Sequence, residues 1–222
     1  MKLFAKYLVS ALALAATGMI GPMTLVTFAE ETPDPHAHHH MMPETNRRIA
    51  EYSVPQVRLV RDDGKTVSLP EELNDGRPVV LSFIYTTCTA ICPLISQTLA
   101  QLQRKLGTDR DRVHLVSISI DPEQDTPARL TAYARKYGAG PEWQHYTGTL
   151  SASIATQRAF DVYRGDKMSH TPVTLLRAAP DKSWVRIEGF ATVNDLLAEI
   201  QNMLASHEAP RTDVSQSIPK SF

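Results

Sequence analysis

Residues 78–93, PVVLSFIYTTCTAICP, give the clearest indication of the fold. The first eight, PVVLSFIY, form an almost continuous apolar run of strand length, which is typical of a central strand buried on both faces. The pattern then changes period, because the apolar residues after Cys92 recur at helical spacing as far as Leu106. Pro93 suits the first turn of this helix, and Gly107 suits its C-terminal cap. The segment therefore predicts a buried strand that leads directly into a helix.

The rest of the chain continues this alternation of strand and helix. Residues 113–120, VHLVSISI, predict a second buried strand, and Asp125-Thr126-Pro127 provides a cap and a proline for another helix. Further along, the sequence predicts a short helix at 151–160, a hairpin of 173–176 with 184–190, and a last helix that starts with Thr192 and Asp195 in capping-box register.

An N-terminal β-hairpin precedes the buried strand. Two alternating segments in VRLVRDDGKTVSL, residues 57–69, flank Asp63-Gly64, which is a strong hairpin signal. Together the elements predict an α/β protein with a mixed central sheet and helices on both faces, in the order of the thioredoxin-like fold. We expect residues 50–206 to form this single domain.

Composition limits the possible functions. The chain has 222 residues, 42% of them hydrophobic and 21% charged, which is typical of one soluble domain with extensions. Lysine and arginine number 23 against 24 acidic residues, so there is no basic excess of the kind that binds nucleic acid. The near-balanced charge and the lack of a long apolar surface helix favour a monomer.

The first 29 residues resemble an export signal. Lys2 and Lys6 precede a long uncharged apolar stretch, and small residues stand before Glu30. The stretch is also long enough to span a bilayer, so residues 1–29 predict either a cleaved signal peptide or a retained N-terminal membrane anchor. In both cases the rest of the protein is exported, to the periplasm or the outer face of the cytoplasmic membrane. At the other end, residues 207–222 are polar and aperiodic, and we expect a disordered tail.

Residues 30–49 predict a solvated linker that is rich in histidine and methionine. Imidazole and thioether groups crowd into seven positions of this linker, and both are ligands that suit copper. They are His36, His38, His39, His40, Met41 and Met42. The cluster is a possible auxiliary metal site; the alternative is a spacer whose histidines are incidental.

The chain has two cysteines, Cys88 and Cys92, at the predicted turn from strand to helix. Cys92 falls at or beside the helix N-cap, where free backbone N–H groups favour a thiolate. A thiolate can bind a metal or attack a disulfide. The three intervening residues leave three interpretations open: a metal site, a redox pair, or a structural disulfide in an exported domain.

A third metal ligand has to come from elsewhere in the domain. Outside the linker and the tail, the histidines are His114, His145 and His170. His114 lies inside a strand pattern and His145 lies among aromatic residues, so both predict structural roles. His170 precedes the 173–176 strand, where a thioredoxin-like fold brings a loop against the cysteine turn. Two thiolates and one imidazole form a soft ligand set that suits copper in either oxidation state, Cu(I) or Cu(II).

These segments resemble the Sco/SenC family of thioredoxin-like, copper-binding proteins that assemble cytochrome c oxidase. The resemblance covers roughly residues 78–200 and rests on three motifs, which are FIYTTCTAICP at 83–93, VSISIDPEQDTPARLTAYARKYG at 116–138 and SHTPVTLL at 169–176. It implies that Cys88, Cys92 and His170 bind copper, that Asp121 shapes a loop, and that the client is the binuclear copper centre in subunit II of cytochrome c oxidase. The family usually has a proline and an acidic or amide residue between the cysteines, whereas this chain has Thr89 and Ala90.

Three functions remain open at the level of sequence. The first is a copper metallochaperone, which makes or breaks no substrate bond and is therefore not an enzyme. The second is a thiol-disulfide oxidoreductase that keeps the copper-ligand cysteines of a client reduced. The third, a peroxiredoxin-like peroxidase, is weaker because no arginine accompanies a Thr-x-x-Cys pattern in a recognisable way. Met168, two residues before His170, is a possible weak extra ligand.

Overall fold

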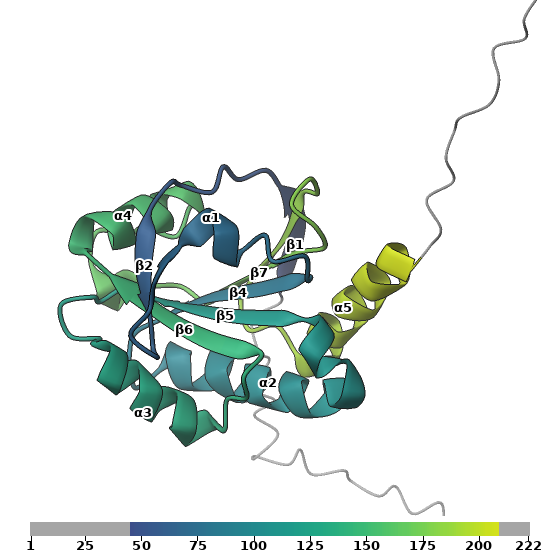
Figure 1. Ribbon diagram of the computed structural model, residues 1–222, viewed down its shortest axis with the longest axis horizontal. Helices are drawn as coiled ribbons and strands as arrows, with labels where there is room; N and C mark the ends of the chain where they lie inside the picture. Colours follow the sequence, from purple (N-terminus) through teal and green to yellow (C-terminus); the bar gives the residue numbers. More distant parts are fainter. Residues whose placement is uncertain (1–44, 209–222) are drawn as a thin grey trace, which may run out of the picture. The chain divides into compact units, whose positions relative to one another are not determined.

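A computed structural model describes residues 45–208, which contain a single mixed sheet with helices on both faces (Figure 1). The strands are β1 (Asn46–Ala50), β2 (Arg58–Arg61), β3 (Thr66–Ser68), β4 (Val79–Ile84), β5 (His114–Ser119), β6 (Trp143–Gly148), β7 (Val173–Arg177) and β8 (Trp184–Glu188). The α-helices are α1 (Leu69–Glu72), α2 (Ile91–Leu106), α3 (Pro127–Tyr137), α4 (Leu150–Ala159) and α5 (Val193–Glu208). Two 3₁₀ helices, Gly107–Arg112 and Lys167–Ser169, complete the described chain.

The eight strands follow the order β1-β8-β7-β4-β5-β6-β2-β3. Strands β4, β5 and β6 run parallel to one another, whereas β7 pairs antiparallel with β4 on the other side. All six residues of β4 are buried, as the apolar run predicted. The predicted α/β class, the mixed central sheet and the helices on both of its faces are therefore confirmed.

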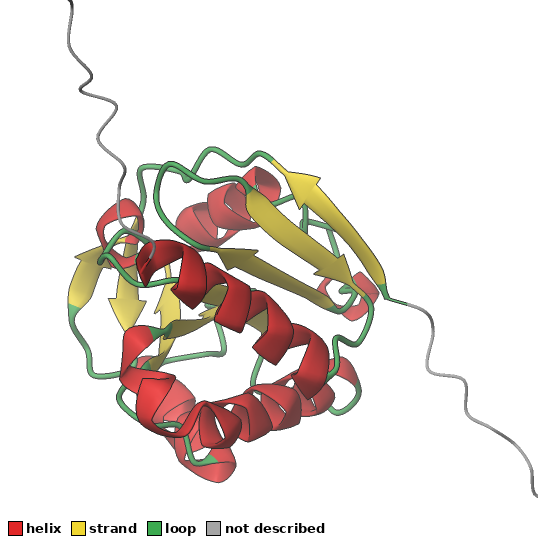
Figure 2. Ribbon diagram, turned by 90° about the vertical axis from the view of Figure 1, so that its right-hand side faces the viewer, coloured by secondary structure: helices red, strands yellow, loops and turns green. Residues whose placement is uncertain are grey.

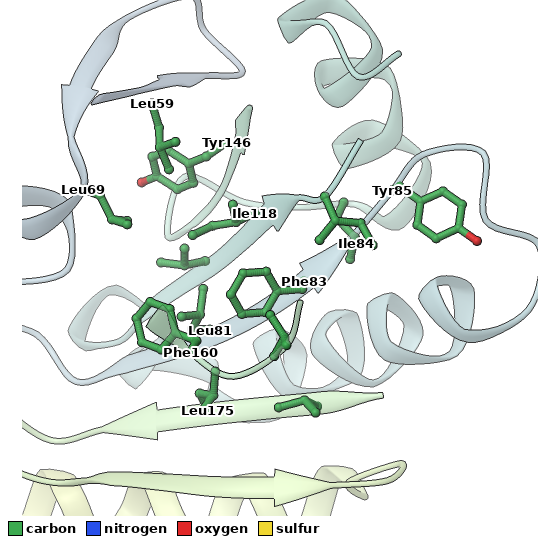
Figure 3. Packing of buried hydrophobic residues seen from close by; sticks show 14 of the residues in the cluster. Leu59, Leu69, Leu81, Phe83, Ile84, Tyr85, Ile118, Tyr146, Phe160 and Leu175 are labelled. Carbon is green, nitrogen blue, oxygen red and sulfur yellow. The ribbon is translucent and has the colours of Figure 1, made fainter. Parts of the chain in front are cut away.

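Alternate residues of β4 face two separate cores. Leu81 and Phe83 point to one side, where Phe160 packs against the Phe83 ring at a centroid distance of 6.0 Å (Figure 3). Val80 belongs to the other core, which contains Leu99 of α2 and Ile200 of α5. Figure 2 shows helices on both sides of the strands, and this double cover accounts for the near absence of polar residues in β4.

The turn and cap signals of the sequence are confirmed as well. Gly64 closes the β2–β3 hairpin with a φ of 86°, a conformation that glycine adopts without strain. The Thr126 side chain accepts a hydrogen bond from the Arg129 N–H and caps α3. Thr192 and Asp195 bond reciprocally at the start of α5, so the capping box forms as predicted.

Three features differ from the sequence-based prediction. Residues 46–49, expected in the linker, form most of β1 and pair with β8, although they remain exposed. The pairing uses backbone groups, and the polar side chains of this edge strand gave no apolar signal. Strand β6 was not predicted, because the buried His145 and Thr147 hide its alternation. Helix α5 ends at Glu208, two residues beyond the expected domain boundary of 206.

The predicted leader, the His/Met cluster and residues 209–222 of the predicted tail lie outside the described residues. Within residues 45–208, none of the helices has the length and apolar character needed to cross a bilayer.

The packing of α2 against the sheet is open to a direct test. Leu99 is fully buried, whereas Leu94 on the same helix is 43% exposed. Changing Leu99 to Ala leaves a cavity, and we expect a loss of about 2–5 kcal/mol in the free energy of unfolding. The matched change Leu94→Ala should cost less than about 1 kcal/mol. Urea unfolding of both variants measures the difference, and equal losses would contradict this packing.

Candidate metal centre

The cysteine turn lies at the carboxyl end of β4. β4 ends at Ile84 and α2 begins at Ile91, and the intervening turn is closed by a 3.1 Å hydrogen bond from the Cys88 N–H to the Tyr85 carbonyl. Both cysteines are free thiols in this structure and both are buried, with Cys88 at 9% exposure and Cys92 at 0%. Because parallel strands end at one edge of the sheet, the loop after β5 reaches the same place.

A backbone N–H at the N-terminus of α2 donates a hydrogen bond to the Cys88 sulfur. The Cys92 N–H, in the first turn of α2, donates a hydrogen bond to Cys88 Sγ at 3.4 Å. Burial raises the pKa of Cys88, but hydrogen bonds from the Cys92 backbone, the Cys92 side chain, the Ala90 backbone and the Tyr85 side chain outweigh it, so the pKa is lowered overall. Cys88 is therefore the thiol that more readily becomes a thiolate.

The expectation for Cys92 was wrong. The helix begins at Ile91, with Ala90 as the N-cap, so Cys92 lies inside the first turn and its side chain belongs to the buried core. Burial strongly raises the pKa of Cys92, and the neighbouring Cys88 raises it further. Helix position alone suggested a thiolate at Cys92, but desolvation of the charged sulfur dominates there.

A buried carboxylate fixes the cysteine turn. Asp125, with 0% exposure, accepts hydrogen bonds from the Thr86 backbone N–H at 3.1 Å and from the Thr86 hydroxyl. It also accepts a 2.6 Å bond from the Ser119 hydroxyl at the end of β5. The sequence pattern predicted that Asp125 is part of a helix cap, but Thr126 does the capping. The DPEQDTP motif marked Asp125 as a residue of interest. The motif did not show that the Asp125 carboxylate would bind the cysteine turn.

His170 lies at the same edge of the sheet. β7 runs antiparallel to β4, so the residues that precede β7 meet the end of β4. His170 Nε2 lies 3.2 Å from the Phe83 carbonyl oxygen, and the ring is 5% exposed. Burial lowers the pKa of His170 against the opposing effect of the Phe83 bond. The neutral imidazole, which is the metal-binding form, is therefore favoured.

Tyr85 connects the cysteine turn to the His170 segment. Its carbonyl accepts the hydrogen bond from the Cys88 N–H, and its hydroxyl donates to Met168 Sδ at 3.7 Å. Burial and the neighbouring Cys88 side chain raise the pKa of Tyr85 to about 12, so the phenol remains a donor at neutral pH. Met168, considered as an extra ligand, is 73% exposed and touches Tyr85. The two predicted ligand segments therefore meet at this residue.

Asp121 ties a third segment to this edge. Its carbonyl accepts hydrogen bonds from the Gln124 and Asp125 N–H groups, which is the loop-shaping role expected for it. Its carboxylate, 8% exposed, forms an ion pair with Lys167 Nζ at 2.6 Å. The Lys167 ammonium also lies 5.7 Å from the centre of the Tyr85 ring. The loop after β5 is thus held against the segment that ends at His170.

The structure gathers these residues without assembling them into a closed ligand set. Among residues 45–208, no three His, Cys, Asp or Glu side chains lie close enough together to hold a metal ion. Cys88 and Cys92 are in hydrogen-bond contact, whereas His170 bonds to a backbone carbonyl. The Phe83 bond occupies Nε2 of His170, so Nδ1 is the ring nitrogen left for a metal.

The other two histidines of the domain are structural, as expected. His114 Nε2 lies 2.9 Å from Gln144 Oε1, and His114 Nδ1 lies 3.1 Å from Asp75 Oδ2. His145 is fully buried beside Trp143, and burial lowers its pKa to about 3.

His170 also borders a cavity. The cavity has a volume of about 360 Å³ and lies between α4, the loop after β5 and residues 162–167. Leu150 and Ile154 of α4 line it together with Arg164. The His170 segment therefore lies beside a hollow of the domain.

Comparison with known proteins supports the resemblance found in the motifs. The SCO1/SenC family model matches residues 47–205. The SCO1 protein homolog of Bacillus subtilis is 35% identical over 104 residues, which cover 46% of this chain and 53% of that protein. The chain thus spans about half the length of the curated relatives it matches.

Two solved structures resemble the described domain. Arabidopsis thaliana ScoI with copper bound is 27% identical, with a TM-score of 0.58, over 69% of this chain and 98% of that one. BsSco, described as a member of the Sco family of cytochrome c oxidase assembly proteins with a disulfide switch, is 26% identical, with a TM-score of 0.59, over 71% and 96% of the two chains. The predicted thioredoxin-like fold is confirmed.

The two thiols should differ in reactivity. With limiting iodoacetamide, we expect Cys88 to be alkylated at pH values where an ordinary thiol is still protonated, because its pKa is lowered. Cys92 should stay unmodified until the protein is unfolded in urea. Peptide mass mapping across pH measures both, with Cys88→Ser as the control that leaves only Cys92. Faster modification of Cys92 in the folded protein would refute this ordering.

Removal of the Asp125 charge should loosen the cysteine turn. In Asp125→Asn an amide NH₂ replaces an acceptor of the Thr86 and Ser119 bonds, and we expect a loss of about 1.5–3 kcal/mol in unfolding free energy. Cys92 should also become open to alkylation. Glu123→Gln, an exposed change in the same loop, is the matched control and should leave both properties unchanged. An Asp125→Asn variant as stable as wild type would rule out the clamp.

Proposed function

The chain belongs to the SCO1/SenC family, and from this premise we propose that it is a copper metallochaperone that binds one copper ion through Cys88, Cys92 and His170. The observation that carries the proposal is the meeting of the two ligand segments at Tyr85, whose carbonyl accepts from the Cys88 N–H and whose hydroxyl donates to Met168 Sδ. Relatives of the chain support copper as the metal, since Arabidopsis ScoI binds it in its solved structure.

The protonation states of these residues suit the binding of a soft metal ion. Cys88 has a lowered pKa and His170 favours its neutral form, so both can act as ligands near neutral pH. Cys92 keeps its proton until metal binds, because burial raises its pKa. Copper binding therefore releases a proton from Cys92, and copper affinity should fall as the pH falls.

Two hydrogen bonds stabilise the metal-free site and so favour release of the copper. His170 Nε2 bonds to the Phe83 carbonyl, and the Cys88 sulfur accepts from the Cys92 N–H. Both groups have partners in the empty site, which lowers the cost of the metal-free form. A carrier needs two such states of similar stability.

The client that we propose is the binuclear copper centre in subunit II of cytochrome c oxidase. BsSco, which is similar over 71% of this chain, is described as a cytochrome c oxidase assembly protein. The leader at residues 1–29 agrees with delivery on the outer side of the cytoplasmic membrane, either in the periplasm or from a membrane anchor. We propose that the protein acts as a monomer.

A second candidate function is thiol-disulfide exchange. The unequal cysteine pair favours it, because Cys88 has a lowered pKa and slight exposure while Cys92 is buried and protonated. In such a pair the first thiol attacks a client disulfide and the second resolves the mixed disulfide. His170 separates the two functions, since exchange does not need an imidazole and the copper site does.

Copper titration tests the metallochaperone function. The reduced full-length protein, with the linker histidines His36, His38, His39 and His40 changed to Asn, should bind one copper ion, with thiolate-to-copper charge-transfer bands in the Cu(II) form. Adding His170→Ala should weaken binding by about 100-fold or more, since even second-shell changes cost about 10–100-fold. Competition with a chelator of known affinity measures the change.

His207→Ala is the matched control, because it removes a histidine outside the proposed ligand set, and it should leave copper affinity unchanged. The same His170→Ala protein should still exchange disulfides with a model thiol at nearly the wild-type rate. If copper affinity is unchanged in His170→Ala, or if the rate of disulfide exchange falls as far as copper affinity, the three-ligand copper site is refuted. Either result would favour the thiol-disulfide function.

A further inference from the structure

Helices α2 and α3 lie side by side in the domain (Figure 1). Hydrogen bonds join them near both ends. The Ser96 hydroxyl lies 2.8 Å from the Tyr133 hydroxyl, and Gln103 Nε2 donates to the Gly138 carbonyl at 2.9 Å. The Tyr133 hydroxyl also donates to the Cys92 carbonyl at 3.4 Å. The first turn of α2, which follows the cysteine turn, is therefore fixed relative to α3.

A groove with a volume of about 420 Å³ runs between the two helices. This α2–α3 groove is lined by Pro93, Gln97, Gln101, Arg104, Lys136 and Tyr137. Pro93 directly follows Cys92 in the chain, so one end of the groove lies at the start of α2. A molecule that occupies the groove therefore lies next to the turn that carries the two cysteines.

The charge of the two helices is entirely positive. Their basic residues are Arg104 and Lys105 in α2 and Arg129, Arg135 and Lys136 in α3. Neither helix contains an aspartate or a glutamate. The whole chain is balanced, with 23 basic against 24 acidic residues, so the positive charge is a local property of this face. A surface with charge of one sign attracts a partner of the opposite sign.

The two cations of the groove are exposed and available to a partner. Among residues 45–208, neither Arg104 nor Lys136 forms an ion pair, and Lys136 Nζ lies 5.3 Å from the centre of the Tyr137 ring. Cations in the last turn of a helix interact favourably with the helix dipole. That interaction accounts for their position, but it does not account for the lack of acidic residues on the earlier turns.

The shape of this face favours a protein partner. Gln97 and Gln101 are exposed one turn apart on α2, and their amides can donate to and accept from a peptide backbone. On the other side of these two residues, a second hollow of about 400 Å³ is lined by Leu94 and Phe190, and Leu94 is 43% exposed. Protein interfaces combine apolar contacts at the centre with a polar rim, and this face offers both.

We propose that the α2–α3 groove binds an acidic segment of a partner protein. Carboxylates of the segment pair with Arg104 and Lys136, and its backbone bonds to the Gln97 and Gln101 amides. The inference rests on the proposed copper-carrying function in one respect, since it identifies the partner as the copper client. Charge pairs at the rim of an interface mainly raise the association rate and make it sensitive to salt. The groove thus brings the client to the cysteine turn.

Fluorescence anisotropy with a fluorescein-labelled hexaglutamate peptide tests the groove. The reduced, metal-free, full-length protein should bind the peptide in about 20 mM salt and bind it at least about 5-fold more weakly in about 200 mM salt, because salt screens exposed charges. Arg104→Gln/Lys136→Gln should weaken binding at low salt by about 10-fold or more, since both charge pairs are lost.

The matched control is Arg110→Gln/Lys182→Gln, which removes two exposed cations outside the groove. It should leave peptide affinity within about 2-fold of wild type, because charges beyond the screening length contribute little. An equal loss of affinity in the two double variants would show attraction by net charge alone and would overturn the groove.

Vesicles of phosphatidylglycerol and phosphatidylcholine distinguish a protein partner from a lipid surface. Wild type and both double variants should sediment with these vesicles to the same extent. If Arg104→Gln/Lys136→Gln alone loses vesicle binding and keeps its peptide affinity, the proposal is overturned and the two cations belong to a membrane-binding surface.

Amide chemical-shift mapping of the isotope-labelled wild-type protein locates the peptide even if a variant does not fold. Hexaglutamate should shift the Gln97 and Gln101 signals, and shifts confined to other elements would overturn the groove. The copper affinity of Arg104→Gln/Lys136→Gln should equal that of wild type, because neither residue is a proposed ligand. Loss of the groove therefore leaves the copper-carrying function intact, whereas a failed copper titration leaves peptide binding by the groove intact.

Discussion

One buried carboxylate, that of Asp125, positions the two loops on which the candidate site depends. It accepts both the backbone N–H and the hydroxyl of Thr86, and it also binds Ser119 at the end of β5. A carboxylate with no exposure is costly unless its oxygens are fully hydrogen-bonded, and here those bonds come from the turn after β4 and from the end of the neighbouring strand β5. Because the turn that carries Cys88 supplies the Thr86 donors, hydrogen bonding of the Asp125 carboxylate fixes the position of that turn.

The sequence predicted the parts of the fold that have a strong local pattern. The apolar run of β4, the glycine of the β2–β3 hairpin and the caps at Thr126 and Thr192 all leave local signatures, and all were found. Strand β6 was missed because its buried polar residues, such as His145, break the apolar alternation. Strand β1 was missed because its pairing uses backbone groups, which no side-chain pattern reports. Motifs identified Cys88, Cys92 and His170 as candidates, but not the contacts of Tyr85 or Asp125, which join residues far apart in the chain.

The cysteine pair shows how burial can reverse an inference from position. The N-terminus of α2 was expected to favour a thiolate at Cys92, yet its Cys92 N–H points at the sulfur of Cys88. A hydrogen bond to a charged group contributes about 1.5–3 kcal/mol, and desolvation of a buried ion costs several kcal/mol. Cys88 keeps slight exposure and gains the bond, so its pKa falls; Cys92 has no exposure, so its pKa rises. The same helix end thus creates an unequal pair. The Cys88 thiol loses its proton more readily than an ordinary thiol, and the Cys92 thiol keeps its proton.

His170 shows how a backbone carbonyl can orient a buried imidazole. Its Nε2 bond to the Phe83 carbonyl contributes a net value of about 0.5–1.5 kcal/mol. The bond leaves Nδ1 as the ring nitrogen that could bind another group, which is the usual arrangement when a histidine binds a metal. At the cysteine turn, the Cys92 N–H orients the Cys88 sulfur in the same way. Backbone groups of β4 and α2 therefore fix the directions of Cys88 and His170 without any metal, and ligands that are ordered in advance lose less conformational entropy when they bind.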